Sequence, residues 1–289
     1  MSLSTPAWPS ELTPHLSILM PAYREQRVIG GLVQDLLRQA DQAAEHYPDY
    51  RLEIVLASDD LFDYSSILPL DDRLVFCKPA MATGPSLARS RALDKARGKF
   101  VVAIDADDTV SDNFIEKVFS ATNRHQAFAI KTSYYKASKL IRSLEVTTLT
   151  LENFIAYSGS ASVVYPRDWM KAYPDVVAED AVAVVNVMQR AGGSLPVIDA
   201  QYNIATHPES FCARLGSQFS RLYADHLQSV DEIATTTGNP KIKGMLHALF
   251  EARIRVNDEF EASLKAGEGL DYHEFMVSRN CGSGNLATA

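Results

Sequence analysis

The first half of the chain alternates short apolar runs with longer amphipathic segments, and this alternation constrains the fold more than any other feature of the sequence. The apolar runs have the length of strands and lie at residues 16–20, 52–57, 73–77 and 99–104. Segments with apolar residues at helical spacing lie at residues 28–47, 84–98 and 112–122. Strands that alternate with helices in this way predict an α/β fold whose mostly parallel sheet is flanked by helices.

Turn and cap residues mark the ends of these helices. Gly84 and Pro85 stand at the entrance of the second helix, and Gly98 lies just past its exit. Ser111 is expected to cap the third helix. The second half is less regular, with strands predicted at residues 128–135, 160–166 and 194–207 and helices at residues 179–193, 219–234 and 242–264.

Composition excludes several classes of protein. The net charge of −8 argues against a general affinity for nucleic acid, whose phosphates favour clustered Lys and Arg. The three cysteines are scattered and show neither metal-binding spacing nor an even disulfide set, which favours a cytoplasmic setting. The N-terminus lacks the pattern of a signal peptide, and no apolar run approaches the roughly 20 residues of a transmembrane helix.

Polar residues gather where the predicted strands end, at Tyr23–Glu25, Ser58–Asp60 and Asp105–Asp108. In open α/β sheets, ligands bind beyond the carboxyl ends of the strands. Side chains at i and i+2 of an extended strand point the same way, so Asp105 and Asp107 are expected to converge on one cation. Carboxylates together with substrate phosphates suit Mg²⁺ or Mn²⁺. The alternative is a turn in which Asp108 and Asp112 only cap the next helix.

The segment GPSLARSRALDKARGKFVVAIDADD, residues 84–108, resembles the central signature of family 2 glycosyltransferases of the GT-A fold. The residues in register are Gly84, Ala88, Arg89, Ala92, Leu93, Ala96, Gly98, Asp105, Ala106, Asp107 and Asp108. Ser90 stands where the family usually has Asn. The aspartates then correspond to the family's D-x-D motif.

The resemblance extends outward over residues 16 to 210. LSILMPAYREQRVI is similar to the family's opening strand and P-x-Y-N turn, with Arg24 at the Asn. EIVLASDDLFDYSS looks like the strand that ends in D-D-G-S, with the acids shifted by one and Leu61 at the Gly. AEDAVAVVNVMQRAGG resembles the family's E-D helix, with Asn186 at the usual Arg.

The family resemblance implies a domain plan as well as a fold. We expect a flexible lead-in at residues 1–15 and a Rossmann-like GT-A catalytic domain at residues 16–208. Its nucleotide-binding half spans residues 16–125 and its acceptor-side half residues 126–208. Residues 209–289 form a C-terminal helical region with a partly disordered tail.

On the donor side, the resemblance implies a nucleotide-diphosphate sugar, with a UDP-sugar favoured over a GDP-sugar. The residues implied in binding it are Pro21, Tyr23, Glu25, Asp59, Asp60, Arg89, Asp105 and Ala106. Asp59 or Asp60 accepts a hydrogen bond from the base, and the shifted register leaves open which. Asp107 ligates Mn²⁺ or Mg²⁺ directly, with Asp105 and His207 as further candidate ligands.

On the acceptor side, the resemblance makes Asp180 the general base that takes the proton of a hydroxyl, with Glu179 as its neighbour. The alternative is that both acids only stabilise the first turn of a helix. Tyr165, Arg167 and Trp169 are expected to line the acceptor pocket. The acceptor itself, whether a sugar, a lipid-linked molecule or a small molecule, is left open.

The reaction expected is an inverting transfer by a glycosyltransferase of the hexosyltransferase class, with a retaining outcome as the alternative on the same fold. A nucleotidyltransferase and a non-catalytic binder of sugar nucleotides are the competing hypotheses. MPAYREQRVIGG lacks the Gly-rich phosphate loop expected of a nucleotidyltransferase. The C-terminal helices are expected to bind acceptor, to pair two subunits as a homodimer, or to lie peripherally on the inner membrane face.

Overall fold

A ten-stranded sheet in the order β3-β2-β1-β4-β9-β6-β10-β5 forms the centre of the protein, with β7 paired to β6 and β8 to β10. The computed structural model describes residues 13–78, 81–157, 161–206 and 219–280. The strands are β1 Leu16–Ala22, β2 Leu52–Ser58, β3 Leu74–Cys77, β4 Phe100–Ala103, β5 Thr109–Val110, β6 Phe128–Lys136, β7 Lys139–Ser143, β8 Thr148–Thr150, β9 Val163–Pro166 and β10 Ser194–Ala205. The helices are α1 Ile29–Ala43, α2 Pro85–Lys95, α3 Phe114–Thr122, α4 Leu151–Tyr157, α5 Glu179–Arg190, α7 Phe219–Gln228, α8 Val230–Thr237, α9 Lys243–Lys265 and α10 Tyr272–Asn280.

The predicted α/β fold with helices flanking the sheet is confirmed. Strands β3, β2, β1 and β4 are all parallel, as the alternation in the sequence predicts. The second half of the sheet is mixed, because β9 runs antiparallel to both β4 and β6 while β10 runs parallel to β6. The carboxyl ends of β1, β2 and β4 therefore meet at one edge, where the polar clusters lie.

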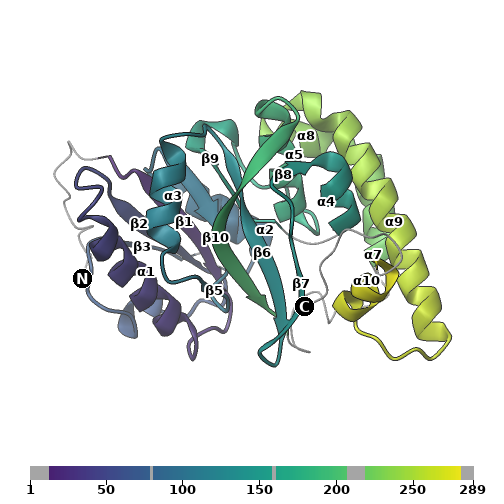
Figure 1. Cartoon of the computed structure of the whole chain (residues 1–289), viewed down its shortest axis with the longest axis horizontal. Coiled ribbons are helices and arrows are strands. Elements are labelled where there is room, and N and C mark those ends of the chain that lie inside the picture. The colour runs from purple at the N-terminus through teal and green to yellow at the C-terminus, as the bar shows by residue number, and fades with distance from the viewer. Residues whose placement is uncertain (1–12, 79–80, 158–160, 207–218, 281–289) are drawn as a thin grey trace.

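Alternation of side chains along the strands divides the core into two layers. In β1, Ile18 and Met20 pack on the face covered by α1 and α3, whereas Leu19 packs on the face that carries α2 and α5. In Figure 1, α1 and α3 lie together on one side of the sheet. Since both faces are covered, the strands read as continuous apolar runs.

Three local expectations need correction. Ser111 does not cap α3, because its hydroxyl accepts the Gln201 N–H at 3.2 Å and the side chain of Gln39 instead accepts the Ile115 N–H at 3.3 Å. The helix predicted at residues 219–234 is two helices, α7 and α8, with Ser229 between them. Helix α10 forms in the C-terminal tail, part of which was expected to be disordered.

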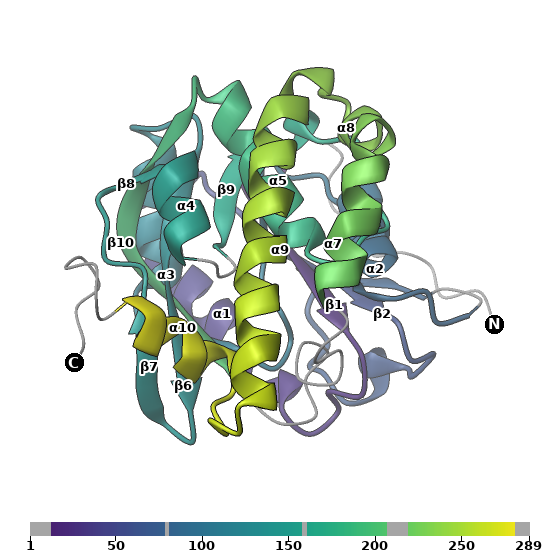
Figure 2. The same ribbon diagram turned by 90° about the vertical axis from the view of Figure 1, so that its right-hand side faces the viewer.

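The C-terminal helices pack against α4 and α5 of the sheet domain. The long helix α9 lies beside α7 and contacts α4, α5 and α8, and Figure 2 shows it crossing in front of α5. Their apolar residues, such as Leu246 and Phe250, belong to the same core cluster as α2 and α5. Across the described part of the chain, no helix combines the length and apolar character that a membrane crossing requires.

Gly98 marks a close approach of the backbone between α2 and β4. Its N–H donates to the Ser17 hydroxyl at 2.8 Å, and a Cβ on residue 98 would lie 2.6 Å from the backbone nitrogen of Ser17. We expect Gly98→Ala to lower the free energy of unfolding by about 1–3 kcal/mol in urea titrations. The control is Gly31→Ala in α1, where a Cβ meets nothing within 4 Å and the change is expected to stabilise by up to about 1 kcal/mol. Equal effects of the two substitutions would contradict the packing argument.

Candidate active site

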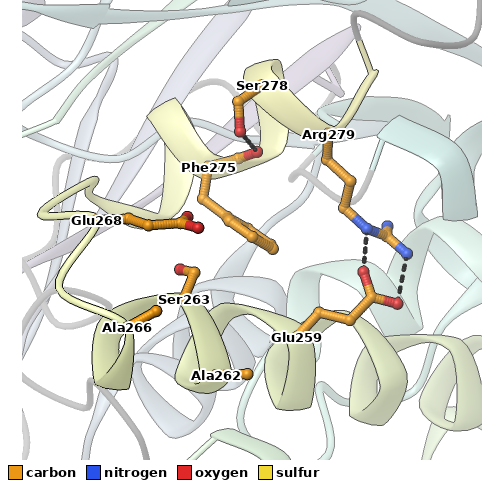
Figure 3. A pocket seen from close by; sticks show the side chains of 8 residues that line it. All are labelled: Glu259, Ala262, Ser263, Ala266, Glu268, Phe275, Ser278 and Arg279. Atoms are coloured by element: carbon orange, nitrogen blue, oxygen red, sulfur yellow. Dashed lines mark hydrogen bonds and ion pairs between the residues drawn. The ribbon is translucent and has the colours of Figure 1, made fainter.

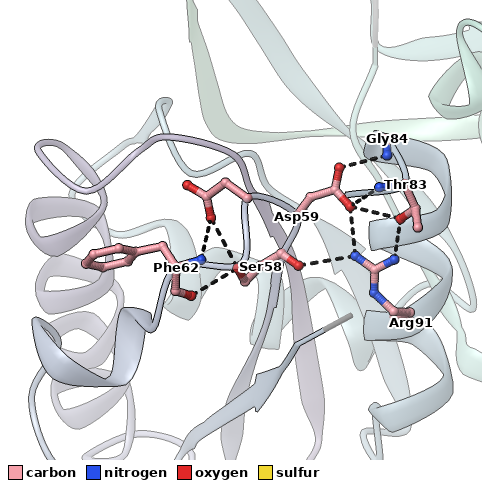
Figure 4. Close-up of polar contacts among 7 residues, drawn as sticks. Ser58, Asp59, Phe62, Thr83, Gly84 and Arg91 are labelled. Carbon is pink, nitrogen blue, oxygen red and sulfur yellow. Dashed lines mark hydrogen bonds and ion pairs between the residues drawn. The ribbon is translucent and has the colours of Figure 1, made fainter. Parts of the chain in front are cut away.

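The turn after β2 is built around two acidic residues with different surroundings. The buried carboxylate of Asp59 accepts the backbone N–H groups of Thr83 and Gly84 at 2.9 and 2.7 Å and pairs with Arg91 at 3.0 Å (Figure 4). These bonds hold the entrance of α2, where Gly84 adopts a φ of 89°. Both oxygens of Asp59 are therefore engaged within the protein.

Asp60 is the more exposed of the two and links the turns that follow β1 and β2. Its carboxylate accepts the Arg24 N–H at 2.7 Å, the Gln26 side-chain amide at 2.8 Å and the Tyr64 hydroxyl at 3.1 Å. Partial burial works to raise the pKa of Asp60, but the hydrogen bonds from Arg24 and Phe62 prevail and lower it. These hydrogen bonds thus favour the ionised form of Asp60.

The central feature of the site is Arg89 of α2, which is 8% exposed and pairs with two carboxylates. One guanidinium nitrogen bonds Glu179 at the start of α5, and another bonds Asp105 after β4. Burial works to lower the pKa of Arg89, yet the charges of Asp105 and Asp180 raise it above its ordinary value. This arginine therefore joins the end of β4 to the start of α5.

The carboxylates around Arg89 differ in what they contact. Glu179 is buried and committed to Arg89. Asp105 keeps 39% of its side chain exposed. Desolvation by the surrounding protein and the charges of Asp107 and Asp180 nevertheless raise the pKa of Asp105, although the charge of Arg89 works to lower it. Asp180 is half-buried, and no hydrogen bond or ion pair joins it to any residue that the structure describes.

The acidic turn after β4 does not have the geometry expected from its spacing. Strand β4 ends at Ala103, and Ala106 and Asp107 form a turn, so the i and i+2 rule for an extended strand does not apply to Asp105 and Asp107. Asp108 does not cap α3: it is buried and bonds the Tyr202 hydroxyl and the Ala205 N–H of β10. Burial and the charges of Asp105 and Asp107 raise the pKa of Asp108 well above its ordinary value.

Whether these residues suit a divalent cation depends on Asp105 and Asp107. The raised pKa of Asp105 reflects in part its repulsion by Asp107, which a cation bound between them would relieve. Mg²⁺ and Mn²⁺ commonly take one or two carboxylates when phosphates and waters complete their shell. Among the described residues no group of three or more His, Cys, Asp and Glu side chains forms a metal site, and His207 lies outside those residues. The residues therefore fit an ion that is shared with a phosphate.

Comparison with known proteins agrees with this geometry. Residues 17–150 match the family described as glycosyl transferase family 2. Residues 17–150 thus resemble a family 2 glycosyltransferase domain.

The curated relatives found are Glycosyltransferase GlyG of Streptococcus pneumoniae and an uncharacterized glycosyltransferase of Haemophilus influenzae. The first is 23% identical over 125 residues, 42% of this chain and 39% of that protein. The second is 28% identical over 109 residues, 36% of this chain and 40% of that protein. The matches thus span about two fifths of either relative.

Solved glycosyltransferases share the fold. S. aureus TarS 1-349 in complex with UDP-GlcNAc superposes with a TM-score of 0.59 at 18% identity, covering 83% of this chain and 72% of that one. Mannosyltransferase PcManGT from Pyrobaculum calidifontis, in complex with GDP-Man and Mn²⁺, gives 0.51 at 14% identity, covering 93% and 80%. The predicted GT-A architecture is therefore confirmed.

Several residues of this candidate site were not found from the sequence. Tyr202 lies on β10, far along the chain, and its hydroxyl accepts the Asp105 N–H at 3.2 Å while donating to Asp108. Arg253 of α9 is buried, and the charge of Asp180 acts on it. Neither residue stands in a recognisable motif, because contacts between distant segments leave no local pattern.

The departures from the family pattern each have a structural role. The Ser90 hydroxyl bonds the backbone of Tyr173 in both directions, at 2.9 and 3.0 Å. Asn186 is fully buried and bonds the Trp169 carbonyl and the side chain of Asn239 at 3.0 and 2.9 Å. Leu61, at the family's Gly, has a φ of 64°, the left-handed conformation that Gly adopts most readily.

The expected acceptor pocket is only partly supported. Tyr165 is 1% exposed and bonds the Tyr173 hydroxyl at 3.1 Å, so it is a core residue and does not line a pocket. Arg167 is exposed and Trp169 packs partly against the core. A cavity of about 440 Å³ lies elsewhere, between α9 and α10, and Figure 3 shows its lining of Phe275 and other residues without any of the site carboxylates.

Removal of the central guanidinium tests how much this site depends on it. We expect Arg89→Met to lower the free energy of unfolding by about 3–5 kcal/mol, because Asp105 and Glu179 lose their shared cation. The control Arg38→Met breaks an ion pair to Asp35 whose side chains are 49% and 33% exposed, and should cost under about 1 kcal/mol. Chemical denaturation of both variants measures the difference, and a similar small loss in each would refute the role given to Arg89.

Proposed function

We propose that this protein is a metal-dependent, inverting glycosyltransferase that moves a sugar from a nucleotide-diphosphate donor to a hydroxyl acceptor. Asp180 acts as general base, and a UDP-sugar is the favoured donor, with a GDP-sugar as the alternative. The observation that carries the proposal is the contrast between the two acids at the start of α5. Glu179 is neutralised by Arg89, whereas Asp180 stays half-exposed and has no ion-pair partner among the described residues.

An inverting transfer needs one base on the face opposite the departing diphosphate. A carboxylate with its charge uncompensated at close range can accept the proton of an acceptor hydroxyl. Asp180 lies within electrostatic range of both Arg89 and Asp105, so the base and the donor edge belong to one site. The Arg89 bridge would hold the two at a constant separation, which is the positioning that the transfer requires.

The donor side supports a nucleotide-diphosphate sugar. Asp107 and Asp105 would hold Mn²⁺ or Mg²⁺, with His207 as a further candidate, and Asp60 and Tyr23 would face the base. When bound, the ion neutralises charge that builds up on the departing diphosphate. The complexes of TarS with UDP-GlcNAc and of PcManGT with GDP-Man and Mn²⁺ support this assignment by analogy of fold.

We further infer that the acceptor enters on the side of the C-terminal helices, since Arg253 of α9 lies within electrostatic range of Asp180. A sugar, a lipid-linked molecule or a small molecule would each present the hydroxyl. Pairing of two subunits through these helices and contact with the inner membrane face are part of the same proposal. Ser90 and Asn186 differ from the residues usual in the family, but they do not favour a non-catalytic role. Each makes hydrogen bonds that hold the surrounding segments in place.

Donor binding should depend on the metal and on Asp107. We expect calorimetry to detect binding of UDP, or of GDP, in the presence of Mn²⁺ and to lose it on addition of EDTA. Asp107→Ala should abolish the metal-dependent part, because one of two carboxylates is removed. The exposed Asp112→Ala serves as the control and should bind as the wild type does. Equal binding with Mn²⁺ and with EDTA would argue against the metal.

Loss of the base should reduce turnover without reducing donor binding. We expect Asp180→Asn to lower the rate of transfer, or of donor hydrolysis, by about 10²- to 10⁴-fold. Nucleotide affinity should stay unchanged. The matched control is Asp175→Asn, an exposed acid in the same loop, which should keep the wild-type rate. A fully active Asp180→Asn would rule out this residue as the base.

A further inference from the structure

The loop that leads into α5 directly precedes Glu179 and Asp180, and other elements hold it on two sides. On one side, two hydroxyl groups of α2 bond the loop. The Ser90 hydroxyl bonds the backbone of Tyr173, and the Ser86 hydroxyl donates to the Val176 carbonyl at 3.2 Å. On the other side, the N–H of Val177 donates to the Nε2 atom of His226 in α7 at 3.1 Å. The C-terminal helices thus reach the backbone two residues before Glu179.

The start of α5 depends on these bonds more than an ordinary helix start does. Ala178 precedes the helix in the left-handed conformation, with φ 61° and ψ 40°, and no side chain caps the first turn. The direction in which α5 presents Asp180 is therefore set by the bonds of the loop. Misplacement of a catalytic group by about 1 Å can cost about 10²-fold in rate.

His226 is suited to accept this bond only while it is neutral. It is 9% exposed and packs against the rings of Tyr223 and Phe250, with ring centroids 6.0 and 5.6 Å away. Because Nε2 accepts the Val177 N–H, the ring carries its proton on Nδ1. Burial lowers the pKa of His226, and the charge of Asp225 and the hydrogen bond with the Val177 backbone oppose this only in part.

We propose that His226 is a positioning residue for the general base: its neutral imidazole holds the Val177 amide and thereby the direction of Asp180. This inference rests on the proposed function of Asp180. Protonation of His226 replaces the accepting nitrogen with an N–H group that faces the Val177 N–H. The loop is then released and the rate of transfer declines. Because burial lowers the pKa of His226 from the ordinary histidine value of about 6.5, this decline occurs as the pH falls below that value and passes through the lowered pKa.

Two substitutions separate the hydrogen bond from the packing. His226→Gln supplies an amide oxygen that can accept the Val177 N–H and does not titrate. His226→Phe keeps an aromatic ring and removes the acceptor. The control is His46→Gln, a histidine with 67% of its side chain exposed that pairs with Glu116 away from the site.

The first readout is the pH profile of transfer or donor hydrolysis. We expect His226→Phe to lower kcat about 10- to 100-fold at all pH values with unchanged UDP affinity. His226→Gln should retain most of the wild-type kcat above pH 7 and lose the histidine step on the acid side. His46→Gln should follow the wild-type profile. Identical acid limbs in wild type and His226→Gln would overturn the inference.

The second readout does not depend on activity. Hydrogen exchange of peptides covering residues 173–180 should be slow in wild type and His226→Gln and at least about 10-fold faster in His226→Phe. Unchanged exchange in His226→Phe would overturn the inference even if that variant lost activity for another reason. If the wild type shows no transfer or hydrolysis with any donor, the proposed function fails, while the exchange experiment still decides whether His226 holds the loop.

Discussion

The rest of the site depends on one buried guanidinium. Arg89 is almost inaccessible to solvent, so its charge is stable there only because Asp105 and Glu179 both pair with it. These two acids come from segments far apart in the sequence, one after β4 and one at the start of α5. Their pairing with a single cation ties the carboxyl edge of the parallel strands to the helix that carries the proposed general base. Glu179 is neutralised by the same contact, whereas no such ion pair holds Asp180, to which we assign the role of base.

Much of the fold could be predicted because it depends on local patterns. Apolar runs of strand length and helical spacing placed the parallel strands, and Gly84 and Pro85 marked the start of α2. The family resemblance named Arg89, Asp105, Glu179 and Asp180 as site residues, and the fold brings these four residues close to one another. The geometry of Asp105 and Asp107 could not be predicted, since β4 ends at Ala103 and the spacing rule for a strand does not extend into the turn. Tyr202 and His226 were missed for a related reason, because each reaches the site from a distant element.

The C-terminal helices are part of the site as well as of the core. They contribute Asn239 to the buried bond with Asn186, His226 to the loop before α5, and Arg253 to the surroundings of Asp180. Of the residues that depart from the family pattern, Asn186 bonds Asn239 and Ser90 of α2 bonds the backbone of Tyr173 in the loop before α5. The family pattern therefore accounts for the donor edge, and this chain's own contacts account for how α5 is held.

The central claim is that Arg89 and Glu179 act as a pair that positions the site, and a double-mutant cycle tests it most directly. Arg89→Met, Glu179→Met and the double variant would be compared in unfolding free energy and in turnover at saturating donor. We predict a coupling energy of about 1–3 kcal/mol, with the double variant more stable than the sum of the single losses implies. Additive effects on both quantities would show that the two residues act independently, and would contradict this account of the site.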